Sequence, residues 1–145
     1  MQLTRFADLG LRVLMYLVQA PAGQRVTTPE IARVFDVPLN HLSKVVNTLA
    51  QAGLVHAVRG RVGGISLARP AAEVRIGDAL LALEGNEPLV NCHKPPCILQ
   101  GSCGLLGVLE SGRLAFYATL NAHTLADVSG QRTGVLLRAL QIHPV

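Results

Sequence analysis

The sequence predicts a mainly α-helical fold with a small β-hairpin wing: a winged helix-turn-helix followed by a long C-terminal dimerisation helix. Apolar residues recur at helical spacing through most of the 145 residues. Two short helical segments joined by a tight turn precede two short strands, whose connection is rich in glycine and arginine. Half of the residues are apolar, which favours one compact unit that buries further surface against a second copy.

The first helix is expected over residues 4–19. Thr4 is a suitable N-cap, and Pro21 and Gly23 follow the expected end. Asp8 and Arg12 lie four residues apart on one face, a spacing that by itself indicates an ordinary surface ion pair. A different face carries the apolar stripe that would pack into the core: Phe6, Leu9, Val13, Leu14 and Leu17.

The next two helices have the spacing of a helix-turn-helix. Thr27 followed by Pro29 and Glu30 gives the cap, proline and acidic signals of a helix start. After a turn at 36–38, a helix is expected over 39–52, with Gly53 as the left-handed residue beyond its end. The core-facing residues of this helix are Leu42, Val45, Val46 and Leu49.

Segments 54–58 and 65–68 are expected to be strands joined by the basic tip 59–64, which makes them the wing. The polar face of the preceding helix and the arginines of the wing favour binding to duplex DNA over a winged helix used only for protein contacts. As contacts to bases or phosphates, Ser43, Lys44 and Asn47 are favoured over His41. The predicted DNA-contacting residues are Thr28, Pro29, Asn40, His41, Ser43, Lys44, Asn47, Arg59, Gly60 and Arg61.

Three domains are expected: a DNA-binding unit over 1–73, a unit over 74–128, and a mobile C-terminal tail over 129–145. The second unit would contain a helix over 74–84, a cysteine-containing loop over 91–104 and a long apolar helix over 105–123. A further helical turn is expected over 124–128. The long helix has few charges on any face, so we interpret it as a dimerisation element.

Charge is concentrated in the first half of the chain. Residues 1–75 carry nine Lys or Arg and four Asp or Glu, whereas residues 76–145 carry four and five. This asymmetry is typical of a phosphate-facing module joined to a sensing or dimerising one. Aromatic residues are few and tryptophan is absent, so a stacking platform for single strands is not expected.

All three cysteines of the chain, Cys92, Cys97 and Cys103, lie within twelve residues. Prolines and glycines in the loop would allow the thiolates to aim at one point, which favours an iron–sulfur cluster with one ligand missing. Structural zinc with His93 or a more distant histidine as fourth ligand is one alternative, although zinc sites more often use C-x2-C pairs. A metal-free thiol switch is the other.

No catalytic constellation, paired carboxylates or P-loop is recognisable, so the chain is not expected to be an enzyme. No apolar run is long enough to span a bilayer, and the clustered thiols suit a reducing compartment, so we expect a cytoplasmic protein without a membrane partner.

Several segments together resemble the iron–sulfur winged-helix repressors, in particular their nitric-oxide-sensing NsrR type. The likeness covers about residues 1–128 and rests on MQLTRFADLGLR (1–12), NHLSKVVN (40–47), VRGRVGGI (58–65), RIGD (75–78), LVNC (89–92) and TLAD (124–127). Related regulators of cluster biogenesis have a histidine shortly after the third cysteine, whereas here Gly104 and Leu105 follow Cys103. Val62 departs from the usual wing pattern.

The resemblance implies a homodimeric repressor of a palindromic operator. Cys92, Cys97 and Cys103 would hold the cluster, [4Fe–4S] favoured and [2Fe–2S] possible, and Asp8 of the partner subunit would supply an oxygen ligand. Nitric oxide would release the DNA and derepress genes for its detoxification. The alternative function on the same fold is regulation of iron or iron–sulfur cluster homeostasis. A small electron-transfer protein is a third possibility, but it leaves the basic winged module without a role.

Overall fold

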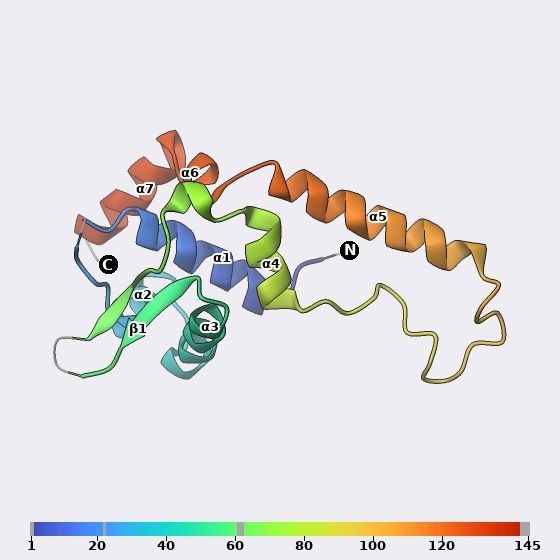
Figure 1. Cartoon of the computed structure of the whole chain (residues 1–145). Helices are drawn as coiled ribbons and strands as arrows, with labels where there is room; N and C mark the ends of the chain where they lie inside the picture. Colours follow the sequence, from blue (N-terminus) through green and yellow to red (C-terminus); the bar gives the residue numbers. More distant parts are fainter. Residues whose placement is uncertain (1, 22, 61–62, 143–145) are drawn as a thin grey trace.

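The computed structural model describes residues 2–21, 23–60 and 63–142. A helical body carries a two-stranded hairpin at one edge, and a long helix extends away from this body to the cysteine-containing loop (Figure 1). The elements in chain order are α1 (Arg5–Val18), α2 (Thr28–Val34), α3 (Leu39–Gln51), β1 (Val55–Val58), β2 (Gly64–Leu67), the 3-10 turn η1 (Ala71–Glu73), α4 (Ile76–Glu84), α5 (Gly104–Asn121), α6 (Leu125–Val128) and α7 (Gln131–Ile142).

Helix α1 is central to the body because its apolar stripe meets α3, α4, α6 and β2. The Thr4 hydroxyl accepts a hydrogen bond from the Ala7 N–H at 3.1 Å, which confirms the predicted N-cap. Tyr16 is fully buried, although it lies outside the predicted apolar stripe. Its hydroxyl donates to Glu30 on α2 at 3.1 Å, and its ring packs edge-on against Phe35.

Helices α2 and α3 form the predicted helix-turn-helix. The Thr27 hydroxyl caps α2 by accepting from the Glu30 N–H, and Pro29 lies in the first turn. Gly53 follows α3 with φ +67°, the left-handed conformation that a helix end favours and that glycine adopts without strain. The four core residues predicted for α3 are all buried.

Strands β1 and β2 pair antiparallel with Val55 opposite Leu67 and Val58 opposite Gly64. Val26 forms a further antiparallel bridge with Ile65, which fixes the hairpin against the segment that leads into α2. Ile65 is buried, while the residues of β1 beyond Val55 face solvent. The hairpin therefore stands as a wing at the edge of the helix-turn-helix.

Helices α4 and α5 approach each other closely at Gly77. A Cβ atom at this position would lie 2.5 Å from Asn121 Oδ1 and 2.7 Å from the Tyr117 carbonyl oxygen. Asn121 accepts from the Asp78 N–H at 2.9 Å and donates to the Asp78 carboxylate at 2.8 Å. Only the C-terminal half of α5 packs on the body, through Phe116, Tyr117 and Leu120.

The C-terminal segment differs from the mobile tail expected over 129–145, because residues 131–142 form α7. This helix packs on the end of α1: Leu137 is buried, Arg138 donates to Gln19 at 2.7 Å, and Gln141 donates to the Tyr16 carbonyl at 3.1 Å. Tertiary contacts of this kind are not visible in local sequence periodicity. The predicted turn over 124–128 is present as α6, with a Thr124–Asp127 capping box.

Within the described ranges, the helices are all too short or too polar to cross a bilayer.

Candidate nucleic-acid interface and cysteine loop

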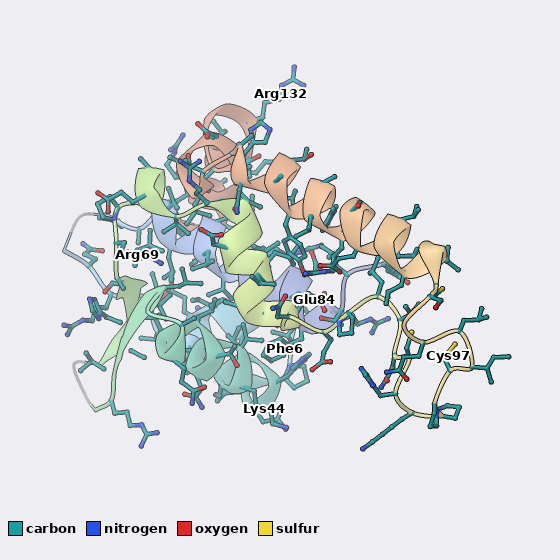
Figure 2. The ribbon with its side chains drawn as sticks, turned by 45° about the vertical axis from the view of Figure 1, so that its right-hand side comes forward. Phe6, Lys44, Arg69, Glu84, Cys97 and Arg132 are labelled. Atoms are coloured by element: carbon teal, nitrogen blue, oxygen red, sulfur yellow. The ribbon has the colours of Figure 1, made fainter. Side chains whose placement is uncertain are left out.

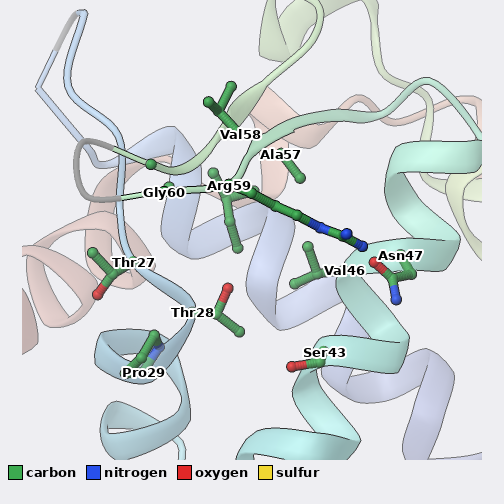
Figure 3. Close-up of a pocket in the computed structure, with 13 residues that line it drawn as sticks. Thr27, Thr28, Pro29, Ser43, Val46, Asn47, Ala57, Val58, Arg59 and Gly60 are labelled. Atoms are coloured by element: carbon green, nitrogen blue, oxygen red, sulfur yellow. The ribbon is translucent and has the colours of Figure 1, made fainter.

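A groove of about 500 Å³ separates the wing from the helix-turn-helix (Figure 3). Its walls come from the start of α2, the outer face of α3, and β1 with the turn that follows it. Thr28, Pro29, Ser43, Asn47, Arg59 and Gly60, all predicted from the sequence, line it. Residues from three separate segments therefore meet on one surface, as the winged-helix interpretation requires.

The outer face of α3 offers side chains of different availability. Lys44 and Asn47 are exposed, and Lys44 projects into solvent in Figure 2. Ser43 is half-buried and its hydroxyl donates to the Leu39 carbonyl at 2.8 Å, so it faces the groove mainly as an acceptor. Lys44 and Asn47 are therefore the residues of α3 with the most freedom to meet a base edge or a phosphate.

Two other predicted contacts lie at the N-terminal end of α3. The Asn40 side chain accepts from the His41 N–H at 2.8 Å and is exposed. His41 is half-buried, with its ring centroid 6.3 Å from that of Phe6 on α1. His41 therefore also packs between α1 and α3, and its contact with DNA stays a prediction.

Arg59 reaches across the groove from the end of β1 towards Asn47 (Figure 3). Its guanidinium and the Asn47 amide come from segments twelve residues apart in sequence, yet both point into the same space. Gly60 itself has φ +110°, a backbone conformation that other residues rarely adopt. The second predicted wing arginine, Arg61, and the atypical Val62 lie outside the described residues.

Sequence reasoning missed part of the groove lining: Thr27, Val46, Ala57, Val58 and Ile65 also contribute to it. Thr27 adjoins two predicted contacts, so its inclusion was available from sequence proximity. The apolar lining was not, because Val46 and Ile65 carry the periodicity of core residues. These apolar side chains line the groove between the polar groups.

The cysteine loop has turns but no helix or strand between α4 and α5. Cys92, Cys97 and Cys103 are half-buried free thiols, and Cys103 is the N-cap residue of α5. Figures 1 and 2 both place this loop well away from the helical body, with Cys97 near its far end. The neighbouring side chains Ile98 and Leu99 are 98% and 58% exposed, so the loop packs little against its own protomer.

The structure does not bring the three thiols to one point as the sequence analysis expected. Among the described residues, no three His, Cys, Asp or Glu side chains are close enough to hold a metal ion. A short, exposed loop has few contacts that would fix such a convergence without the ligand itself. The donor set nevertheless fits a cluster chemically, because three accessible cysteines in one loop supply the soft thiolates that iron–sulfur clusters use.

Asp8 lies in the first turn of α1 and accepts a hydrogen bond from Arg12 at 3.0 Å, as its spacing predicted. Both side chains are about half exposed, so this pair contributes little to stability. Asp8 also lines a hollow of about 370 Å³ together with His41 and Pro38 at the start of α3. The cysteine loop of the same protomer projects away from this position (Figure 1).

Comparison with known proteins places these features in a family. Residues 3–131 match the Rrf2 family, described as iron-dependent transcriptional regulators. Among solved structures, Staphylococcus aureus CymR is 26% identical with a TM-score of 0.69, covering 88% of this chain and 98% of that chain.

Two further structures share the fold at lower identity. IscR of T. potens is 23% identical with a TM-score of 0.66, covering 100% of this chain and 93% of that chain. CymR (YrzC), the global cysteine regulator of B. subtilis, is 21% identical with a TM-score of 0.66, covering 89% and 96%. The match over nine-tenths of the sequence, with a winged helix-turn-helix and a wing groove in place, establishes that the chain belongs to the Rrf2 family of transcriptional regulators.

Proposed function

We propose that the protein is a homodimeric repressor that binds operator DNA through α3, the start of α2 and the wing. The observation that carries this proposal is the groove in which Arg59 and Asn47 meet from two different elements. A guanidinium and an amide are the groups best suited to phosphates and to bidentate base contacts. Regulators of the Rrf2 family bind DNA and are typically dimeric, which supports the same conclusion.

A second copy of the chain is the proposed occupant of the apolar surface of α5. Every residue of this helix is exposed or half-buried, including Leu105, Val108 and Leu114, which are 63%, 69% and 57% exposed. An apolar helix that extends away from its own body has a large surface to bury in a dimer. Two winged domains joined through α5 would bind half-sites about 34–36 Å apart, which is one helical turn of DNA.

Arg59→Ala tests the DNA interface. The DNA is a duplex that the wild-type protein selects from a random library. The affinity for it should fall about five- to a hundredfold, and the slope of log affinity against log salt concentration should become shallower by about one. Arg132→Ala removes the same charge from α7, on the opposite side of the molecule from Lys44 in Figure 2, and should change neither. Equal effects of the two substitutions would mean that Arg59 contributes to DNA affinity only through the net charge of the protein and not through its place in the groove.

For the signal, we propose that Cys92, Cys97 and Cys103 hold an iron–sulfur cluster and that Asp8 of the partner subunit completes its ligands. Bound there, the cluster would supply iron that nitric oxide attacks. An oxygen ligand suits this soft site less well than a thiolate, so the Asp8 carboxylate is the ligand most readily released. The placement of Asp8 on the body and of the cysteines on a projecting loop favours a ligand from the second copy.

Release of Asp8 would remove one restraint on the first turn of α1, which the hydrogen bond from the Thr4 N–H to Glu84 of α4 also holds. This turn lies beside the start of α3, because Asp8 and His41 line one hollow and Phe6 stacks near His41. A shift of α1 therefore reaches the DNA-reading helix through direct packing. Loss of the match between two recognition helices and their half-sites would release the operator, and the genes so derepressed are proposed to detoxify nitric oxide.

Anaerobic purification followed by metal and sulfide analysis tests the cofactor. The expected result is a coloured protein with comparable amounts of iron and sulfide and with operator affinity that nitric oxide abolishes. Colourless protein with stoichiometric zinc would contradict the cluster. Operator affinity that is the same in loaded, nitric-oxide-treated and metal-free protein would contradict the coupling.

Asp8→Ala tests the link to α1. The three thiolates should still retain iron, whereas the change in operator affinity on addition of nitric oxide should largely disappear. Arg12→Ala is the matched control, because it removes the same surface ion pair but keeps the carboxylate. An Asp8→Ala protein with an unchanged spectrum and an unchanged response would rule out Asp8 as a ligand.

Regulation of iron or iron–sulfur cluster supply is the second candidate function. The description of the Rrf2 family as iron-dependent favours it directly. Release of the operator by an iron chelator at a rate similar to its release by nitric oxide would support this alternative. Resistance to the chelator combined with rapid release by nitric oxide would support the first.

A further inference from the structure

The backbones of two of the three cysteines, Cys92 and Cys97, lie opposite each other across a tight turn. His93 and Pro96 form an antiparallel bridge, and the Cys97 N–H donates to the Cys92 carbonyl at 3.0 Å. The Asn91 side chain accepts from the His93 N–H at 2.9 Å and steadies the start of the turn. The next opposed pair outside the bridge is Cys92 with Cys97, and such pairs have Cα atoms about 5.5 Å apart, within the range that disulfides span.

The third cysteine is placed differently. After Cys97 the chain turns, with the Gln100 N–H donating to the Cys97 carbonyl at 3.1 Å and Gly101 at φ +90°. Cys103 then begins α5 as its N-cap residue. The antiparallel register therefore aligns Cys92 with Cys97 and not with Cys103.

We propose that, in the protein without bound metal, Cys92 and Cys97 form a reversible intramolecular disulfide while Cys103 remains a thiol. The oxidant is a low-molecular-weight disulfide, to which both half-buried cysteines are accessible. One protein thiolate attacks it, forms a mixed disulfide and expels one small thiol. The other protein thiolate attacks that mixed disulfide, closes the Cys92–Cys97 bond and expels the second small thiol, so two electrons and two protons leave the protein.

The consequence for regulation rests on the proposed function. The disulfide removes two of the three thiolates proposed to hold the cluster, so oxidised protein cannot be reloaded with iron and sulfide until a thiol reduces it. The loop would then respond to the redox state of the low-molecular-weight thiols, in addition to the proposed response to nitric oxide. The disulfide itself requires no cluster and can be tested whether or not the cofactor proposal holds.

The test uses the full chain, freed of metal with a chelator and treated with glutathione disulfide. Free thiols are alkylated with one reagent, the protein is reduced, and the released thiols are labelled with a second. Mass spectrometry after cleavage at Leu99 separates Cys92 and Cys97 from Cys103. The expected result is loss of the first label at Cys92 and Cys97 together, with Cys103 fully carrying it.

Matched serine variants sharpen the outcome. Cys103→Ser should retain the disulfide within one chain, whereas Cys92→Ser and Cys97→Ser should lose it. In wild-type protein, iron and sulfide incorporation should be lost on oxidation and restored by a thiol reductant. Cys103 paired with either other cysteine, disulfides between chains as the main product, or three thiols that stay reduced would each overturn the proposal.

Discussion

Gly77→Ala tests the contact that positions α5, and with it Cys103 at the start of that helix. The added Cβ would meet the Tyr117 carbonyl oxygen at 2.7 Å and Asn121 Oδ1 at 2.5 Å. Asn121 can rotate away, but only by giving up its two hydrogen bonds with Asp78. The Tyr117 carbonyl is helix backbone and cannot rotate, so the two helices must separate.

The magnitude follows from opposing contributions. Replacing a helical glycine with alanine stabilises by at most about 1 kcal/mol. Overpacking costs about 1–3 kcal/mol, and the two hydrogen bonds to Asp78 are worth about 1 kcal/mol each. The free energy of unfolding should therefore fall by about 2–4 kcal/mol, which lowers the melting temperature by roughly 5–15 °C in a chain of this length.

Urea unfolding followed by far-ultraviolet circular dichroism measures this difference. Gly112→Ala is the control, because a Cβ at that position of α5 meets open space in the protomer and should leave the protein as stable or slightly more stable. Gly77→Ala protein as stable as Gly112→Ala protein would refute the reasoning. A loss of stability in both would indicate that the cost is not specific to the α4–α5 contact.

Two further predictions concern α1 and its neighbours. Burial raises the pKa of Tyr16, and its hydrogen bond to Glu30 raises it further, so folding favours the neutral phenol. The contribution of Tyr16 to the free energy of unfolding should therefore be fully present below about pH 10 and be lost as the pH rises beyond it. Tyr16→Phe should reduce this alkaline loss of stability, measured by urea unfolding at a series of pH values. Leu137→Ala should lower the free energy of unfolding by about 2 kcal/mol, whereas Leu136→Ala, at a residue 67% exposed, should change it little. Equal effects at the two leucines would mean that α7 does not dock on α1 as described.

Most helices and the wing were predictable because their signals are local. The Thr4 cap, the Thr27 start and Gly53 each act within a few residues, and the structure confirms all three. The apolar stripe of α3 likewise specifies its buried face without reference to the rest of the chain. The groove followed from these elements, since a helix-turn-helix and the hairpin directly after it have few ways to pack.

The parts that were not predicted depend on contacts distant in sequence. Helix α7 contains Gly134, a poor helix former, and its attachment relies on Gln19 and on the Tyr16 carbonyl more than a hundred residues earlier. Tyr16 can be buried without an unpaired hydroxyl because Glu30 on another helix accepts its hydrogen bond. The arrangement of the three thiols could not be predicted from the sequence either. The spacing of the cysteines gives the number of possible ligands, but not the path of a loop with so few contacts.

Helix α1 connects the parts of the proposed mechanism. Asp8 lies in its first turn, Tyr16 ties its last turn to α2, and its C-cap residue Gln19 is held by α7. Because both of these attachments hold the C-terminal end of α1, a change at Asp8 would act mainly on the first turns, which lie beside the start of α3 and are otherwise held by the hydrogen bond from the Thr4 N–H to Glu84 of α4. The attachment of α7 therefore bears on regulation as well as on stability, because a loosened C-terminal end would let α1 shift as a whole and would weaken the effect of Asp8 on the DNA-reading helix.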